Sequence, residues 1–320
     1  MNYGKSSIKR RARQIDRKPV KVRRKIGVVF GKILLICVLI IGVVGVSTVV
    51  GAVKGILASA PDISAVDVIP TGFSTTVLAS DGSEIATLVA EGSNRRSVTL
   101  DEIPKDLQHA VVAIEDERFY EHNGIDLKGI ARALVADLKS MDFTQGASTI
   151  TQQLVKNNVL SEQWESENTG DISKIEKMER QVQRKIQEMY IAVELEKKVD
   201  DKDWILENYL NSINLGNNTL GVQAAAERYF GKDVSDLTLS ECAVIAGITK
   251  NPSRYNPILY PKQNAKRRKM VLDAMKKQGY ITQKQYDEAM ADDVYDRISE
   301  HNSGFETSMN SYFVDSVIDD

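Results

Sequence analysis

The chain has 320 residues, and its content of 42% hydrophobic and 27% charged residues is typical of a protein with a globular core. Residues 1–25 contain eleven Lys or Arg and one Asp, a net charge of +10, so a total charge of −2 leaves −12 for the remainder. That acidic remainder excludes a nucleic-acid partner on charge grounds. The two isolated cysteines, Cys37 and Cys242, exclude a disulfide framework and a cysteine metal site.

The first predicted element is a membrane-spanning helix at residues 33–53. These 21 residues contain no charge and lie between Lys32 and Lys54. About 20 helical residues cross a bilayer core roughly 30 Å thick. The dense positive charge of residues 1–32 predicts that this tail is cytoplasmic, where it also suits anionic lipid, and that the rest of the chain is extracellular or periplasmic. The alternative is a cleaved signal peptide, but its apolar region would be shorter, about 7–15 residues.

Residues 54–83 are predicted to be a linker followed by the start of a β-hairpin. The linker ends in a turn at Pro70-Thr71-Gly72, and Ser80-Asp81-Gly82 separates two short segments, 75–78 and 84–88. An Asp-Gly pair between two such segments is typical of a hairpin turn. This hairpin is the one pair of strands that the sequence predicts.

From residue 103 onward, apolar residues recur at intervals of three and four, which predicts helices. Pro104 suits a first helical position, and Thr238-x-x-Glu241 predicts a capping box. The acidic stretch Ser161–Asp171 is rich in Ser, Asn and Gly and is predicted to be a loop. The expected fold class is therefore mainly α. The predicted helices are 104–114, 127–138, 148–160, 180–198, 204–213, 222–230 and 242–248, with two more within 262–292.

Two carboxylates stand out for their surroundings. Glu115 follows an apolar helical face and precedes Phe119 and Tyr120, so it is expected to be partly desolvated, as a general acid or base requires. Glu188 lies four residues after Arg184 on a predicted helix, where the two side chains share a face. Each pattern alone is more typical of a structural role, either a solvated acid at a helix end or a surface pair that contributes about 0.3–0.5 kcal/mol.

A polar segment, residues 146–157, is predicted to bind sugar or phosphate. Its start holds four hydroxyl or amide side chains, namely Ser148, Thr149, Thr151 and Gln152. Such side chains are poor core material because buried polar groups need partners. Lys156 follows Gln152 by four residues, so on a helix both project from one side, and an ammonium beside hydroxyls suits a diphosphate. The alternative is a polar helix start with a lysine that extends to solvent.

Five short motifs follow one another between residues 115 and 257. They are Glu115-Asp116-x-x-Phe119-x-x-His122-x-Gly124, Gly146-x-Ser148-Thr149-x-Thr151-Gln152-Gln153-Leu154-x-Lys156-Asn157, Arg184-Lys185-x-x-Glu188, Ile205-Leu206-Glu207-x-Tyr209-Leu210-Asn211, and Leu239-Ser240 continued by Asn251-Pro252-Ser253-x-Tyr255-x-Pro257. In this order, behind a single predicted membrane helix, they resemble the peptidoglycan glycosyltransferase family, family 51 of the glycosyltransferases. That family includes monofunctional transglycosylases and the N-terminal domain of class A penicillin-binding proteins.

The resemblance implies a lysozyme-like, two-lobed fold over residues 84–260, with a larger α-helical lobe, a small membrane-contacting lobe and a cleft between them. It implies that lipid II is polymerised into β-1,4 glycan strands, with inversion at the anomeric carbon and release of undecaprenyl diphosphate. The partners would be lipid II, the growing glycan chain, membrane lipid and other cell-wall synthesis proteins.

The resemblance also assigns roles to single residues. Glu115 would be the general base, and Glu188 the second essential carboxylate, which orients the substrate or a divalent cation (Mg or Mn) near the diphosphate. Lys156 and Arg184 would neutralise the leaving group. No cofactor is expected to be obligatory. Further substrate-binding side chains would be Asp116, Phe119, His122, Ser148, Thr149, Gln152 and Arg180.

Residues 261–320 are predicted to be a helical extension that leads towards an absent transpeptidase domain. Ser311-Tyr312-Phe313-Val314-Asp315 resembles that passage in class A penicillin-binding proteins, yet no Ser-x-x-Lys occurs outside the N-terminal tail and no Lys-Thr-Gly follows. We therefore expect the N-terminal part of a bifunctional protein. Two alternatives are a lysozyme-like muramidase or lytic transglycosylase, and a non-catalytic membrane-anchored scaffold for wall proteins.

Overall fold

The structure, a computed structural model, describes residues 4–15, 18–61, 68, 75–78, 84–88, 96–140, 146–160, 173–217 and 219–302. It forms two compact units, residues 1–59 and 60–320. The predicted turns at 70–72 and 80–82, the predicted loop at 161–171 and the passage at 311–315 lie outside the described residues.

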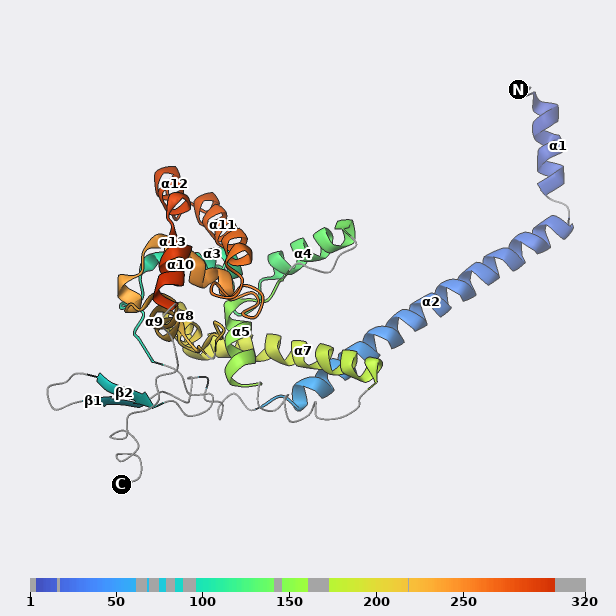
Figure 1. Ribbon diagram of the computed structural model, residues 1–320. Helices are drawn as coiled ribbons and strands as arrows, with labels where there is room; N and C mark the ends of the chain where they lie inside the picture. Colours follow the sequence, from blue (N-terminus) through green and yellow to red (C-terminus); the bar gives the residue numbers. More distant parts are fainter. Residues whose placement is uncertain are drawn as a thin grey trace. The chain divides into compact units, whose positions relative to one another are not determined.

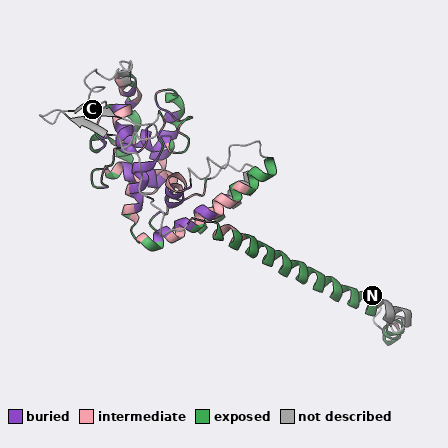
Figure 2. Ribbon diagram, turned by 90° about the horizontal axis from the view of Figure 1, so that it is seen from below, coloured by how far each residue is buried: buried purple, intermediate pink, exposed green. Residues whose placement is uncertain are grey.

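The N-terminal unit consists of two helices, α1 (Lys5–Ile15) and α2 (Lys18–Ala58). Within α2, residues 25–58 include a stretch with a mean hydropathy of 3.0, and none of that stretch is buried. Figure 2 shows this helix as exposed along its described length. Burying apolar surface away from water contributes about 25 cal/mol per Å², so such a helix needs an apolar environment. It is long and apolar enough to cross a membrane, as the sequence predicts for residues 33–53.

The second unit contains a two-stranded antiparallel sheet. Strand β1 (Thr75–Leu78) pairs with β2 (Glu84–Leu88), with Thr75 opposite Leu88 and a shift of register between Val77 and Leu78. β-Branched residues such as Thr, Val and Ile favour this extended backbone. The two predicted strands of the hairpin are confirmed.

The rest of the second unit is helical, which confirms the expected mainly α class. Figure 1 labels the elements in chain order. They are α3 (Lys105–Glu115), α4 (Leu127–Ser140), α5 (Ile150–Asn158), α7 (Lys174–Val199), α8 (Lys202–Ser212), α9 (Val222–Phe230), the 3-10 helix η1 (Val234–Asp236), α10 (Leu239–Ile248), α11 (Pro261–Lys277), α12 (Gln283–Ala291) and α13 (Val294–Asn302).

Three helices differ from the sequence prediction, each for a local reason. Helix α7 begins six residues earlier than expected, because the Ser173 hydroxyl accepts the Glu176 backbone N–H at 3.2 Å and caps it. Helix α10 begins directly after Thr238, whose predicted capping box with Glu241 is present. Helix α13 was not predicted, because a nine-residue helix with few apolar positions gives a weak periodic signal.

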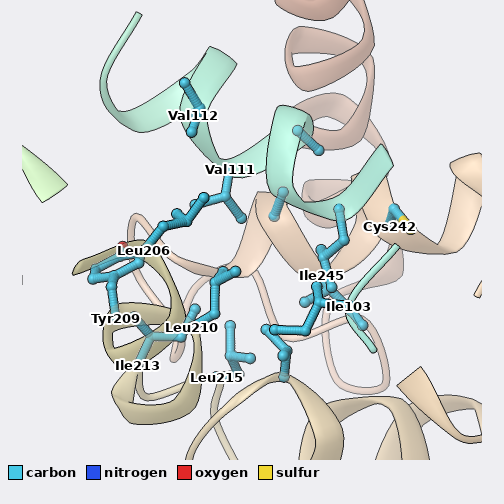
Figure 3. Close-up of a cluster of buried hydrophobic side chains, with 14 of the residues drawn as sticks. Ile103, Val111, Val112, Leu206, Tyr209, Leu210, Ile213, Leu215, Cys242 and Ile245 are labelled. Carbon is cyan, nitrogen blue, oxygen red and sulfur yellow. The ribbon is translucent and has the colours of Figure 1, made fainter. Parts of the chain in front are cut away.

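Helix α10 lies in the middle of the hydrophobic core. It is apolar on almost every side and packs against α3 and α11. Figure 3 shows Cys242 and Ile245 of α10 in one cluster with Val111 of α3 and Leu210 of α8. Truncating a buried leucine at such a site to alanine costs about 2–5 kcal/mol. Helices α11, α12 and α13, which lie in the predicted extension, contribute side chains to the same core, among them Val271, Leu272, Met275, Ala289, Val294 and Ile298.

The loop that follows α3 lies directly against α7. Gly124 has a φ of +82°, and a Cβ at this position would lie 2.6 Å from the carbonyl oxygen of Ala192 in α7. Glycine alone accommodates both that dihedral and that approach. Helix α5 in turn packs against α7 and α8. The end of α3, the start of α5 and the middle of α7 are therefore fixed relative to one another.

Candidate active site

Four side chains singled out in the sequence line one pocket of about 270 Å³. They are Glu115 at the end of α3, Ser148 just before α5, Lys156 in α5 and Glu188 in α7. The fold therefore assembles residues from three separate motifs around one space. The remaining lining residues are Ile114, Gly146, Gln153, Thr249, Lys250 and Arg267.

Both oxygens of the Glu115 carboxylate accept hydrogen bonds. The Thr249 hydroxyl lies 2.7 Å from Oε1, and the Gln153 amide donates to Oε2 at 3.0 Å. The Arg267 guanidinium lies 3.5 Å from Oε1. The Glu115 side chain is 13% exposed. An ionised carboxylate has about four lone-pair positions, so Glu115 is held in one orientation and still has capacity to accept a proton from a substrate in the pocket.

A buried tyrosine fixes the direction of the Gln153 amide. The Tyr209 hydroxyl donates to Gln153 Oε1 at 3.1 Å, which leaves the amide nitrogen to face Glu115. Burial raises the pKa of Tyr209 well above its usual value, and the charges of Glu115 and Asp116 raise it further. The phenol therefore stays protonated at neutral pH and remains a donor.

Glu188 is surrounded by cations. Its side chain is 6% exposed, and it accepts hydrogen bonds from Arg184 Nε and Lys185 Nζ, both at 3.0 Å. The predicted Arg184–Glu188 contact is present, but it is not the exposed surface pair that helical spacing alone favoured. A carboxylate this deeply buried depends on its partners, because removing one of them leaves an uncompensated charge.

Lys185 connects the two halves of the candidate site. Its ammonium donates to Ser148 Oγ at 2.7 Å, to Gln152 Oε1 at 2.9 Å and to Glu188 Oε2 at 3.0 Å. Two of the predicted substrate-binding side chains, Ser148 and Gln152, are thus bonded to a lysine that we did not select as a site residue. The available signal was its place three residues before Glu188, a spacing at which helical side chains meet.

Lys156 faces the same pocket without a direct partner in the described part of the chain. Burial lowers its pKa, the charge of Glu188 opposes this, and the nearby Arg184 and Lys185 lower it further. Lys156, Lys185 and Arg184 together place three cations close to Glu188. An arrangement with more cations than carboxylates suits a ligand with two or more negative charges.

A family model described as Transglycosylase matches residues 81–276, which contain every residue that lines this pocket. The chain belongs to the transglycosylase family. The family resemblance expected from the five motifs is confirmed.

Named relatives of this transglycosylase are penicillin-binding proteins. The chain is 40% identical over 286 residues to penicillin-binding protein 1A of Vibrio cholerae, covering 89% of this chain and 32% of the relative. It is 41% identical over 257 residues to penicillin-binding protein 1A of Escherichia coli, covering 80% and 28%. A crystal structure of penicillin-binding protein 1A from Haemophilus influenzae matches with a TM-score of 0.37 and 25% identity over 71% of this chain and 21% of that one. The chain thus spans about a third of the length of the curated relatives.

Four predicted substrate-binding residues of this transglycosylase lie in the interior and do not line the pocket. Asp116 accepts the Ile150 backbone N–H at 2.9 Å and lies 3.0 Å from His122 Nε2. Thr149 caps α5 by accepting the Gln152 backbone N–H at 3.1 Å, and it donates to the Gly124 carbonyl at 2.8 Å. These contacts give Asp116, His122 and Thr149 a role in holding the first motif against the start of α5.

The other two predicted binding residues outside the pocket lie in different surroundings. Phe119 is fully buried, with the Lys202 ammonium 4.5 Å from its ring centre, so it has no surface to offer a substrate in this conformation. Arg180 bonds to Glu176 at 3.0 Å, one turn earlier on α7, and is not among the lining residues.

Three lining residues of the transglycosylase pocket, Thr249, Lys250 and Arg267, were not predicted from the sequence. Arg267 had a usable signal. It precedes Val271 and Met275 at intervals of four on α11, and both of these are buried, so it lies on the core face of its helix. An arginine on a core face needs a buried partner, and Glu115 is that partner.

The expected divalent cation does not fit the donor set around Glu188. Both of its carboxylate oxygens already accept hydrogen bonds from cationic side chains. A second metal-ligating side chain would be needed, and no group of three or more His, Cys, Asp or Glu able to hold a metal occurs among the described residues. The cations that surround Glu188 offer the charge that a metal would otherwise supply.

Proposed function

We propose that this chain is the glycosyltransferase part of a class A penicillin-binding protein and that it polymerises lipid II into β-1,4 glycan strands. One observation supports this most strongly. A single pocket has the carboxylate Glu115 at one side and Glu188 with its cations at the other. A base and a diphosphate-binding cluster in one space are what this transfer reaction needs.

In the proposed reaction, Glu115 takes the proton from the 4-hydroxyl of the acceptor GlcNAc. The freed oxygen attacks C1 of the terminal MurNAc of the growing chain, and the new C–O bond forms as the bond from C1 to the diphosphate breaks. The electron pair leaves with undecaprenyl diphosphate, so configuration at C1 inverts. Lys156, Lys185 and Arg184 would stabilise the charge that develops on the leaving group, because preorganised cations act most strongly where water is scarce.

Glu188 would act by holding these cations in place. Its two oxygens bind Arg184 and Lys185 separately, so each cation has a fixed position before the substrate arrives. Ser148 and Gln152 would then offer the donor sugar or diphosphate a polar surface beside Lys185. The role proposed for Glu188 is positioning, with contact to the substrate through its bound cations.

The anchor gives the proposed reaction its location. We propose that α2 spans the cell membrane with its basic N-terminal side in the cytoplasm and that the second unit lies outside. Lipid II and undecaprenyl diphosphate are both lipid-linked, so a tethered enzyme meets its substrate at the membrane surface. Other cell-wall synthesis proteins are the expected partners.

Polymerisation of purified lipid II by the full chain in detergent tests the proposal. Glu115→Gln should lower the rate by about 10²–10⁴, the usual contribution of a general base, without unfolding the protein. Glu117→Gln is the matched control, because Glu117 lies two residues away, pairs with Arg132 at 3.0 Å and does not line the pocket. Digestion of purified peptidoglycan without polymerisation would favour the muramidase alternative, and full activity in Glu115→Gln would remove Glu115 as the base.

A further inference from the structure

A second pocket, of about 430 Å³, lies at the other ends of the helices that build the catalytic site. Asp106 near the start of α3 and Ser240 near the start of α10 line it, together with residues of α12 and α13. Helix α3 runs from this pocket to Glu115, and α10 runs from it to Thr249. At 1.5 Å per residue each path is about 14–16 Å long. The two pockets share no lining residue and are separate sites.

The floor of this second pocket has an unpartnered polar group. Ser240 is 3% exposed, and its hydroxyl has no hydrogen-bond partner among the described residues. Arg297 lowers the pKa of the neighbouring Asp292, and Ser240 adds a smaller contribution. Buried hydroxyls are normally hydrogen-bonded, so the Ser240 oxygen in the wall of a cavity is available to a ligand.

The two cations of this pocket are already neutralised. The Lys232 ammonium bonds to both oxygens of the fully buried Glu241, at 2.9 and 3.0 Å. The Arg297 guanidinium pairs with Asp292 through two nitrogens, at 2.7 and 2.8 Å, and also contacts Glu241 at 3.2 Å. Neither cation is left over for an anionic ligand.

Two carboxylates of the pocket lack comparable partners. Asp106 has no hydrogen bond or ion pair in the part of the chain that the structure describes. Glu288 has Lys284 at 3.7 Å, with both side chains largely exposed, and such surface pairs contribute little. The pocket and its floor hold four carboxylates and two cations, and the N-terminal ends of α3 and α10 add only about half a positive charge each. The site is therefore negative.

We propose that this pocket binds a cationic side chain of a peptide, an ammonium or a guanidinium, between Asp106, Glu288 and the Ser240 hydroxyl. Asp106 and Glu288 provide the opposite charge, and Ser240 Oγ accepts a hydrogen bond from the cation. The shared chemistry fits a basic residue of a partner protein and an amine-bearing stem peptide of the cell wall. The pocket uses α12 and α13, which follow the residues that the transglycosylase model matches, so its role is separate from glycosyl transfer.

Calorimetric titration of the full chain in detergent at low salt tests this with three capped tripeptides, alanine-X-alanine with X as lysine, arginine or norleucine. At least one of the two cationic peptides should bind with a Kd of about 1 mM or below, and the neutral norleucine peptide should not bind. Asp106→Asn and Glu288→Gln should each weaken binding about tenfold. Asp287→Asn is the matched control, because Asp287 neighbours Glu288 on α12 but does not line the pocket. Equal binding of the norleucine peptide, or unchanged binding by both variants, overturns the proposal.

Ser240→Ala separates a binding role from a structural one. Because the hydroxyl makes no hydrogen bond in the free protein, its removal should leave the melting temperature unchanged or raised. The same change should weaken the cationic peptide several-fold. A stem peptide with D-residues and a free amine then distinguishes the two sources, since tighter binding than the all-L peptide points to the cell wall and weaker binding to a partner protein. Binding of neither peptide contradicts the proposal.

Discussion

The Thr249 hydroxyl lies 2.7 Å from Oε1 of Glu115, although the two residues are 134 positions apart in the chain. The contact joins the end of α10 to the end of α3, two helices that pack together in the core. Thr249 also lies 2.8 Å from the Ala246 carbonyl, so its single proton is placed between two acceptors. The packing of two buried helices thus determines where the candidate base stands.

Thr249→Val should therefore lower the rate of lipid II polymerisation with little loss of stability. A hydrogen bond to a charged group contributes about 1.5–3 kcal/mol, which corresponds to a decrease of roughly 10- to 100-fold if it acts on the transition state. Valine fills nearly the same volume as threonine. Thr249→Ser keeps the hydroxyl and should retain most of the activity, so equal losses in Val and Ser variants would contradict the role of the hydrogen bond.

Tyr209→Phe should lower activity through Gln153. Without the phenol hydroxyl, Gln153 Oε1 loses its donor and the amide is free to turn away from Glu115. We expect a rate decrease of a few-fold and a stability loss of about 1 kcal/mol. Gln153→Leu removes the same contact, so the double variant should be no worse than the poorer single variant.

Tyr229→Phe controls for the loss of a buried phenol. The Tyr229 hydroxyl donates to the Leu215 carbonyl at 2.6 Å and has no contact with the catalytic pocket. It should reduce stability by a similar amount without reducing the rate of polymerisation per folded molecule. If Tyr209→Phe behaves in the same way, the Tyr209–Gln153 contact has no part in catalysis.

The sequence predicted the helices and the anchor well, because those signals are local. The apolar run of 33–53, the Asp-Gly turn between the strands and the capping box at Thr238 each reside in a few adjacent residues. Helix α13 was missed because only its packing, through Val294 and Ile298, identifies it as part of the core. The site carboxylates were found through a family pattern, since helical spacing alone favoured a structural role for both.

The division of labour within the motifs was beyond the reach of the sequence. Asp116, Phe119 and His122 stand in the same motif as Glu115, yet only Glu115 lines the pocket. A motif does not distinguish a side chain that touches the substrate from one that holds the loop in place. The same limit applies to Lys185, whose contacts with Ser148 and Gln152 depend on α5 and α7 lying side by side.

Lys185→Met should impair both the site and its assembly. The change removes the hydrogen bonds to Ser148, Gln152 and Glu188 and leaves Glu188 with Arg184. We expect the polymerisation rate to fall by about 10²–10³, as for the loss of a preorganised transition-state donor, with a measurable decrease in melting temperature.

Lys197→Met is the matched control, because Lys197 also pairs with a glutamate three residues away on α7, but 63% of its side chain is exposed. Such a surface pair contributes about 0–1 kcal/mol. Its loss should change neither rate nor melting temperature. Lys185→Arg keeps the charge and should recover part of the activity, and full activity in Lys185→Met would exclude Lys185 from the diphosphate site.

Lys156→Met should raise stability and lower activity, which separates a functional cation from a structural one. Burial lowers the pKa of Lys156 below its ordinary value of 10.5. The folded protein therefore binds this proton less tightly than the unfolded chain, and the resulting destabilisation is complete below the lowered pKa and disappears as pH rises towards 10.5. The melting temperature of Lys156→Met should exceed that of the parent at pH 7 and approach it at alkaline pH, whereas polymerisation should fall about 10²–10³. Lys128→Met, on the exposed face of α4, should change neither quantity. If Lys156→Met lowers stability and activity together, the lysine supports the fold and the proposed contact with the leaving diphosphate is wrong.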